Sequence, residues 1–253
     1  MKRHISILAA AIALSLPLHA QTELPSGGSG TIIRNEGFTV SFSNNTNTPE
    51  WVAWELTAEE ASATQYSRTD EFLPDPRLKD SPVPSDYSRS GYDRGHMAPA
   101  ADFKWSLTAM EESFRLSNIC PQNHVLNEKT WCDLEKQCRT WAKHYDRLWI
   151  CCGPIYSDDP RTIGREHHVA VPTSFFKVIM KEFKGRVYTI GFIFPNEPVA
   201  GPFLDYAVSV DEVEKVTGLD FFTSLDDKVE KAAERLCNPK DWTYYMIPFK
   251  YDQ

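Results

Sequence analysis

The stretch Tyr92-Asp93-Arg94-Gly95-His96-Met97-Ala98-Pro99-Ala100-Ala101-Asp102 is the most informative part of this chain. It places the guanidinium of Arg94 and the imidazole of His96 two residues apart, with a glycine between them. In an extended strand, residues two apart point to the same side, so we expect both groups to converge on one phosphate. Histidine is the natural proton acceptor near neutral pH, since its unperturbed pKa is about 6.5. The stretch therefore predicts proton-transfer chemistry, although a lone histidine is more often structural.

A second motif follows, Asn118-Ile119-Cys120-Pro121-Gln122, and after it come Asn127, Trp131, Glu135 and Arg139. These four are spaced by four residues, so on a helix they form one slanted ridge. Asn127 and Glu135 offer the hard oxygen atoms that magnesium favours, and Arg139 is placed to hold a phosphate. The alternative is a solvated helix face with a Glu135–Arg139 ion pair and Trp131 in the core.

Together the two motifs resemble the DNA/RNA non-specific endonuclease family. The resemblance continues in Cys152-Gly153-Pro154-Ile155, in residues 164–178, in the Trp51-Val52-Ala53 strand and in residues 210–219, so that it covers about residues 38–222. It implies an α+β fold in which a ββα-metal finger packs on a central, mainly antiparallel sheet flanked by helices. It also implies hydrolysis of phosphodiesters in DNA and RNA to leave 5′-phosphates.

The roles implied by the resemblance apply residue by residue. His96 resembles the general base, Asn127 the direct ligand of Mg²⁺, and Glu135 the residue that reaches the metal through water. Arg94 and Arg139 resemble the arginines that bind the phosphate, and Asn118 the residue that helps to position the site. Mn²⁺ is expected to substitute for Mg²⁺. In secreted bacterial relatives a further phosphate-binding arginine follows the Trp51-Val52-Ala53-Trp54 strand, where this chain has Glu55.

The amino end reads as a secretory signal peptide over residues 1–20. Lys2 and Arg3 precede an apolar run over residues 5–18, which Pro17 interrupts, and the small residue Ala20 follows. The run is too short for a membrane anchor, so we expect no membrane span in the mature form. The protein is therefore expected to be exported, either to the periplasm or out of the cell.

The charge of the chain is acidic but unevenly distributed. There are 27 Lys and Arg against 35 Asp and Glu, and without Lys2 and Arg3 the balance is −10. Residues 87–147 hold nine basic and eight acidic side chains, so the segment with both motifs is the part that is not acidic. Affinity for nucleic acid comes largely from Lys and Arg, and this distribution leaves room for a polyanionic substrate.

Hydrophobic patterning predicts the remaining elements. Residues 21–36 are expected to form a loose lead-in and residues 37–253 a single domain. Residues 38–43 and 51–56 read as a hairpin, and further strands are expected at 148–155, 175–180 and 186–194. Capping boxes are expected at Thr108 with Glu111 and at Ser209 with Glu212, the second helix ending at Gly218. A last helix is expected over about residues 225–236, and a long loop over residues 72–87.

Some questions stay open at this level. Six cysteines in an exported protein permit disulfides in fifteen pairings, and adjacent Cys151 and Cys152 look like a strand that exposes its two faces. His124 stands between the two motifs and is a candidate for contact with substrate. A catalytically silent nucleic-acid-binding module and a phosphodiesterase of small diesters are the rival functions. Nothing in the sequence decides whether the chain forms a homodimer.

Overall fold

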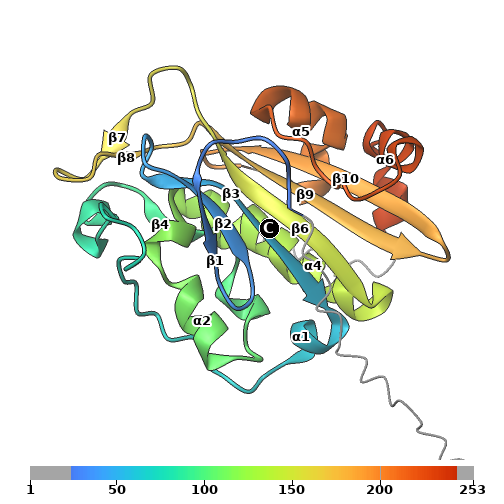
Figure 1. Ribbon diagram of the computed structural model, residues 1–253, viewed down its shortest axis with the longest axis horizontal. Coiled ribbons are helices and arrows are strands. Elements are labelled where there is room, and N and C mark those ends of the chain that lie inside the picture. The colour runs from blue at the N-terminus through green and yellow to red at the C-terminus, as the bar shows by residue number, and fades with distance from the viewer. Residues whose placement is uncertain (1–23, 200, 244–253) are drawn as a thin grey trace, which may run out of the picture.

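The structure, a computed structural model, describes residues 24–199 and 201–243. The proposed signal peptide lies outside the described residues. Seven strands form one sheet in the order β1-β2-β3-β6-β9-β10-β11 (Figure 1). They are β1 (Thr31–Arg34), β2 (Thr39–Ser43), β3 (Thr48–Thr57), β6 (Arg147–Ile155), β9 (Ser174–Phe183), β10 (Arg186–Pro195) and β11 (Ala207–Val208). Every pairing in this sheet is antiparallel, which confirms the expected sheet.

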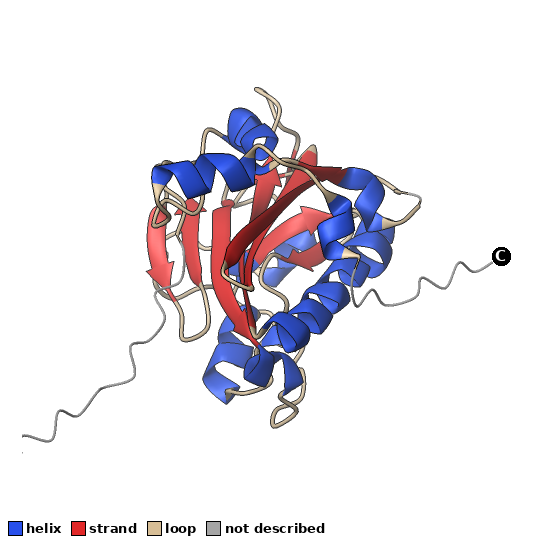
Figure 2. Ribbon diagram, turned by 90° about the vertical axis from the view of Figure 1, so that its right-hand side faces the viewer, coloured by secondary structure: helices blue, strands red, loops and turns tan. Residues whose placement is uncertain are grey.

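Alternation along the strands gives the sheet two apolar faces. On β3, Trp54 packs in a cluster with Trp141 of helix α4 (Cys132–Tyr145). Its neighbour Ala53 packs in a second cluster with Val213 of helix α5 (Val210–Thr217). Figure 2 shows helices on both sides of the sheet accordingly. The sheet is therefore the middle layer, with α4 on one face and α5 on the other.

The other helices are short. They are α1 (Ala58–Ser62), α2 (Leu107–Ser113), α3 (His124–Leu126) and α6 (Asp227–Glu234), with a π-helical turn over Asn127–Trp131. A two-stranded sheet of β4 (Asp93–His96) and β5 (Ile119–Gln122) stands apart from the large sheet, as does a small pair, β7 (Thr162–Ile163) and β8 (Val169–Ala170). Within the described residues, no helix combines the length and apolar character needed to cross a membrane.

Most expected elements are present, and three differ. Residues 21–36 are not only a loose lead-in, because β1 pairs with β2 and so begins the sheet before residue 37. The helix expected from Thr108 is α2, but its N-cap is Ser106, whose hydroxyl accepts from the Ala109 amide. Leu107 lies on the exposed side of α2, whereas Met110 is buried. The last helix is shorter than expected and spans Asp227–Glu234.

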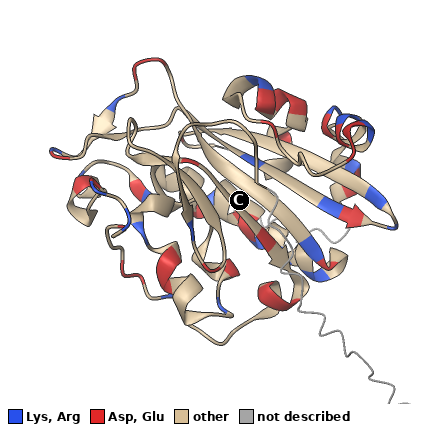
Figure 3. Ribbon diagram, in the orientation of Figure 1, with Lys and Arg blue, Asp and Glu red and all other residues tan. Residues whose placement is uncertain are grey.

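The second expected capping box is confirmed. The Ser209 hydroxyl accepts from the Glu212 amide, and the Glu212 carboxylate accepts from the Ser209 amide at 3.1 Å. Gly218 ends α5 with φ of +70°, a left-handed conformation that glycine adopts without strain. Acidic residues gather on α1, α2 and α5, as Figure 3 shows.

The six cysteines are all unpaired in this structure. Cys151 packs in the cluster beneath α5, and Cys152 packs in the cluster beneath α4. Their side chains thus point to opposite faces of β6, as the sequence suggested. The Cys152 thiol donates to the Met97 carbonyl at 3.2 Å, which ties the large sheet to the segment that follows His96.

Candidate active site

A ββα unit carries the predicted site residues. β4 pairs antiparallel with β5, so that His96 lies opposite Ile119 and Gly95 opposite Cys120. α3, the π-helical turn and α4 follow β5 without interruption. The two sequence motifs, about 25 residues apart, therefore form the two strands of one hairpin-like ladder, and the helix begins directly beside it.

His96 is buried between two aromatic rings. Its centroid lies 4.9 Å from that of Phe114 and 5.3 Å from that of Phe72, and only 8% of the residue is exposed. Its Nε2 atom has no hydrogen-bond partner among the described residues. Burial, together with the nearby guanidinium groups of Arg68 and Arg94, lowers the pKa of His96 to about 3. The imidazole is therefore neutral at physiological pH, and a proton acceptor must be neutral.

Arg94 and His96 do project to the same side of β4. The Arg94 guanidinium carbon lies 4.3 Å from the centroid of Phe72, the ring that also contacts His96. A second guanidinium, that of Arg68, lies 4.9 Å from the centroid of Phe114. Two aromatic rings thus hold a neutral imidazole between two positive charges, an arrangement suited to an anionic substrate.

Asn127 is oriented by a carboxylate from the first motif. Its amide nitrogen donates to Asp93 Oδ2 at 2.9 Å, which turns Oδ1 to the other side of the amide group. His124 Nδ1 lies 3.0 Å from the same Asp93 oxygen. A cleft of about 300 Å³ is lined in part by Phe72, Asp93, Arg94 and Asn127. An oriented amide oxygen in a cleft fits a hard cation such as Mg²⁺.

The helix after Asn127 departs from the expected continuous ridge. Residues Asn127–Trp131 form a π-helical turn, a feature that is frequent at functional sites. The turn shifts the register between Asn127 and the rest of the ridge. Trp131 is 1% exposed and lies in the core, as the alternative interpretation held for this residue.

Arg139 has a different partner from the one that the sequence suggested. Its guanidinium donates to Asp102 Oδ1 at 2.8 Å, and the other Asp102 oxygen accepts from the Trp54 indole at 3.1 Å. Asp102, which is 1% exposed, therefore anchors the arginine from below. Because Arg139 remains partly exposed, its outer edge is available to an anion.

Glu135 lies half-buried above a lysine. Burial raises the pKa of the Glu135 carboxyl, and the charges of Lys177 and Arg139 oppose that rise. Lys177 is 1% exposed, and its ammonium lies 4.1 Å from the centroid of Trp131 and 5.4 Å from that of Trp54. This cation on β9 supports the carboxylate from the sheet side.

Asn118, predicted among the catalytic residues, does not reach the cleft. It is fully buried, its Oδ1 accepts from the Ala98 amide at 3.0 Å, and its Nδ2 donates to the Ala98 and Ser113 carbonyls. The polar atoms of the side chain are thus occupied by backbone groups. Asn118 fixes the segment after His96 and is a positioning residue.

Glu55, at the position where secreted relatives carry a phosphate-binding arginine, does not face the site. Glu55 follows Trp54 on β3, and since successive side chains point to opposite faces, it lies on the face away from α4 and Asp102. Its carboxylate pairs with Arg147 at 2.9 Å, next to Trp149 on the adjacent strand. The nearby additional arginine comes instead from Arg68, in the loop after α1.

Four residues of the site were not predicted from the sequence: Asp93, Asp102, Arg68 and Lys177. Asp93 and Asp102 stand within the first motif, so their position there was the available signal. Lys177 stands in the Phe175-Phe176-Lys177-Val178 segment, where a lone lysine in an apolar strand could have marked it. Arg68 belongs to no motif in the sequence, because it lies in a loop and only the path of that loop brings it to Phe114.

Gly95 allows β4 and β5 to approach closely, and we expect Gly95→Ala to reduce activity strongly. A Cβ atom at this position would lie 2.2 Å from Oε1 and 2.5 Å from Cβ of Gln122, which is fully buried. Overpacking of this kind costs about 1–3 kcal/mol, and a displacement of about 1 Å at His96 can cost about 10²-fold in rate. Thermal unfolding and nuclease kinetics measure both effects. Gln122→Gly in the same chain removes both clashing atoms and should restore part of the activity; if it restores none, the steric explanation fails.

Comparisons with known proteins place the chain in one family. Residues 18–228 match the family described as DNA/RNA non-specific endonuclease. A mitochondrial nuclease of Saccharomyces cerevisiae is 35% identical over 224 residues, which cover 78% of this chain and 67% of that protein. A nuclease of Nostoc sp. is 31% identical over 241 residues, 87% of this chain and 86% of that protein. A crystal structure of the EndoG/EndoGI complex superposes with a TM-score of 0.75 at 30% identity, over 80% of this chain and 89% of the matched one.

Proposed function

Because the chain belongs to the DNA/RNA non-specific endonuclease family, we propose that it is an exported, Mg²⁺-dependent endonuclease that hydrolyses DNA and RNA to 5′-phosphate products. The observation that carries this proposal is the junction of the β4–β5 pair with the helical segment that follows β5. There a neutral, buried imidazole and an oriented amide oxygen lie beside guanidinium groups. His96 is the general base, and Asn127 is the protein ligand of the metal.

The side chains divide the reaction among themselves. Arg94 and Arg139 bind the phosphate, and Arg68 adds positive charge on the Phe114 side. His96 accepts a proton from the attacking water, a role worth about 10²–10⁴-fold in rate. Since Nε2 is buried beneath Phe72, that ring or the Arg94 side chain must shift when substrate and water enter.

The donor set fits a hard divalent cation. Asn127 would hold it directly and Glu135 through water, and Mn²⁺ would substitute for Mg²⁺. When bound, the cation supplies positive charge that stabilises the phosphate and the leaving 3′ oxygen. The side chains proposed to bind the substrate are charged groups that contact its phosphate, and none is proposed to contact a base. Contacts to phosphate carry no sequence information, which supports activity on many sequences and on both sugars.

Export is proposed from the amino end of the chain. A mitochondrial transit peptide is amphipathic and rich in Arg and Ser, whereas residues 5–18 are an almost continuous apolar run. Expression in a bacterial host followed by fractionation and mass spectrometry would locate the cleavage site, which we expect near Ala20. Retention of the uncleaved chain in the cytoplasm would contradict export.

A digestion assay tests the activity directly. The purified mature chain should degrade double-stranded DNA, single-stranded DNA and RNA in Mg²⁺, and EDTA should stop it. Mass spectrometry of short products should find 5′-phosphates. Full activity in EDTA would contradict the metal, and no cleavage of any polynucleotide in Mg²⁺ or Mn²⁺ would contradict the function.

The pH dependence should reflect the burial of His96. A base works in its neutral form, so a pKa lowered to about 3 means that activity persists as the pH falls below 6.5, the ordinary value. Phe72→Ala removes part of the cover, so the pKa should rise and the acid limb of kcat/KM should move toward 6.5. Rates between about pH 4.5 and 8 measure this. A wild-type acid limb at 6.5 that Phe72→Ala leaves in place would show that burial does not set it.

A further inference from the structure

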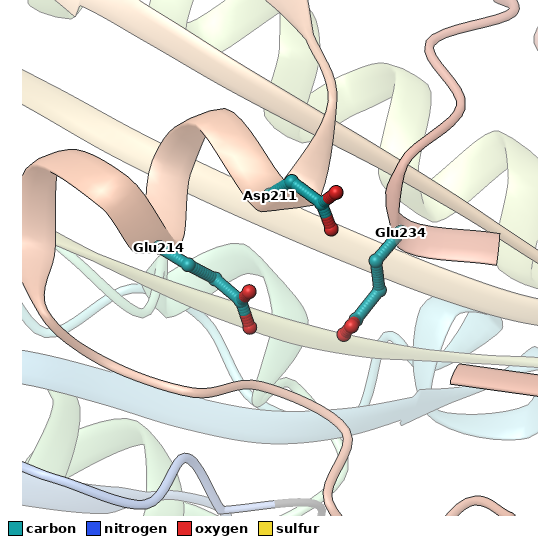
Figure 4. A group of neighbouring side chains, drawn as sticks. All are labelled: Asp211, Glu214 and Glu234. Carbon is teal, nitrogen blue, oxygen red and sulfur yellow. The ribbon is translucent and has the colours of Figure 1, made fainter. Parts of the chain in front are cut away.

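Three carboxylates from two helices converge on the face of the sheet opposite the ββα unit. Asp211 and Glu214 lie on α5, and Glu234 is the last residue of α6. One oxygen from each of the three lies within 4.8 Å of the others. Figure 4 shows the three side chains pointing toward one another.

Glu234 distinguishes this group from an ordinary acidic surface. The residue is only 3% exposed, and its Oε1 is buried without a hydrogen-bond partner among the described residues. Glu214 beside it accepts from the Phe221 amide at 2.9 Å, which leaves its charge only partly compensated. A buried charge without a partner is costly, and proteins normally neutralise it with a counter-charge or a metal.

The charges near Glu234 increase that cost. Burial raises the pKa of Glu234 to about 8, and the carboxylates of Glu214, Glu230, Asp211 and Asp220 add to that rise. Without a cation, a proton would be the group that relieves the repulsion. A bound metal ion and a bound proton can be distinguished by experiment, because only the metal ion's occupancy changes when metal is added.

We propose that Asp211, Glu214 and Glu234 form a second cation site that binds a divalent ion of the Ca²⁺ class and clamps α6 to α5. The donors are carboxylate oxygens, which hard cations select. Ca²⁺ holds oxygens at about 2.3–2.6 Å, so oxygens on opposite sides of the ion are about 4.8 Å apart. Mg²⁺ dehydrates reluctantly and is usually held by only one or two carboxylates, so three converging carboxylates favour Ca²⁺. Exposed Asp211 leaves one side open to water.

The clamp joins two elements that otherwise meet mainly through β10. α5 and α6 each contact that strand, and the Thr189 hydroxyl of β10 donates to the Ala233 carbonyl at 2.9 Å. A bound ion would add a direct link between the helices. The site is separate from Asn127, because α5 and α4 cover opposite faces of the sheet.

Thermal unfolding of the full mature chain, stripped with EDTA and then dialysed, tests the proposal. Adding CaCl₂ to about 100 times the dissociation constant should raise Tm by about 5–10 °C, and MgCl₂ at the same concentration should raise it less. Glu234→Gln should remove the Ca²⁺-dependent rise. At a pH above about 8, where Glu234 is ionised without a cation, it should also raise Tm in the absence of Ca²⁺, since one of the repelling charges is gone.

Two controls separate this site from the catalytic one. Glu111→Gln removes the same charge from an exposed position on α2 and should keep the full rise. Asn127→Ala should keep it as well. Should Glu234→Gln fail to fold, Asp211→Asn at the exposed edge of the group should weaken Ca²⁺ binding, measured by calorimetry, at least tenfold.

Three results would each overturn the proposal. The first is a wild-type Tm that Ca²⁺ does not change, which would mean that Glu234 holds a proton only. The second is a Ca²⁺-dependent rise that survives intact in Glu234→Gln, and the third is a rise that is lost in Asn127→Ala, which would place the ion at the catalytic site. An equal rise with Mg²⁺ would overturn the Ca²⁺ assignment.

Discussion

Replacing His96 by alanine is expected to lower the turnover of DNA by about 10²–10⁴-fold while leaving the affinity for DNA nearly unchanged. The imidazole is neutral and buried between Phe72 and Phe114, so it contributes a proton acceptor and little charge. The positive charges that attract the phosphate belong to Arg94, Arg139 and Arg68. Single-turnover rates in Mg²⁺ and the Kd for a DNA duplex in EDTA, where no cleavage is expected, separate the two effects.

A matched control is available in His124. This imidazole is exposed and pairs with Asp93, close to Asn127, so His124→Ala should keep most of the turnover. Since His96→Ala leaves a cavity in an aromatic cluster, its folding must be checked by circular dichroism and Tm. Near-normal turnover in a folded His96→Ala protein would show that another group accepts the proton.

The large sheet could be predicted because its signals are local. Strands β2, β3, β6, β9 and β10 each carry an apolar pattern that is complete within the strand, and adjacent Cys151 and Cys152 already suggested a strand with one cysteine on each face. β1 was missed because it is an edge strand with one buried residue, Ile33. β1 is a strand because it pairs with β2, and its own sequence carries no alternating apolar pattern that would reveal it.

The site was predicted less completely because its geometry comes from contacts between distant segments. The motif indicates that His96 is a base, but the pKa of about 3 depends on Phe72 and Arg68, which a loop delivers. The same is true of Asn127, since only the pairing with Asp93 shows which way the amide faces. The sequence identified Glu55 only as a departure from secreted relatives, because a motif match gives no side-chain direction, whereas the alternation on β3 does.

Asn127→Ala is expected to weaken Mg²⁺ binding and to lower activity at least tenfold at moderate Mg²⁺, in contrast to the turnover defect of His96→Ala. The substitution removes the amide oxygen whose direction the hydrogen bond to Asp93 fixes, and it leaves Asp93 to pair with His124 alone. Part of the activity should return at high Mg²⁺ or with Mn²⁺, because mass action compensates for a lost ligand but not for a lost base. The Mg²⁺ concentration that gives half-maximal activity, measured beside kcat, tests this distinction.

Asn127→Asp makes the argument sharper. It keeps an oxygen ligand and adds charge, but it removes the N–H group that donates to Asp93 at 2.9 Å and places two carboxylates side by side. If Asp93 orients the ligand, this variant should also require more Mg²⁺, and Asp93→Asn in the same chain should recover part of the loss. If Asn127→Ala binds Mg²⁺ as wild type does while His96→Ala does not, the roles of the two residues are exchanged. The metal then belongs on the β4 side of the cleft, and the base must be sought elsewhere.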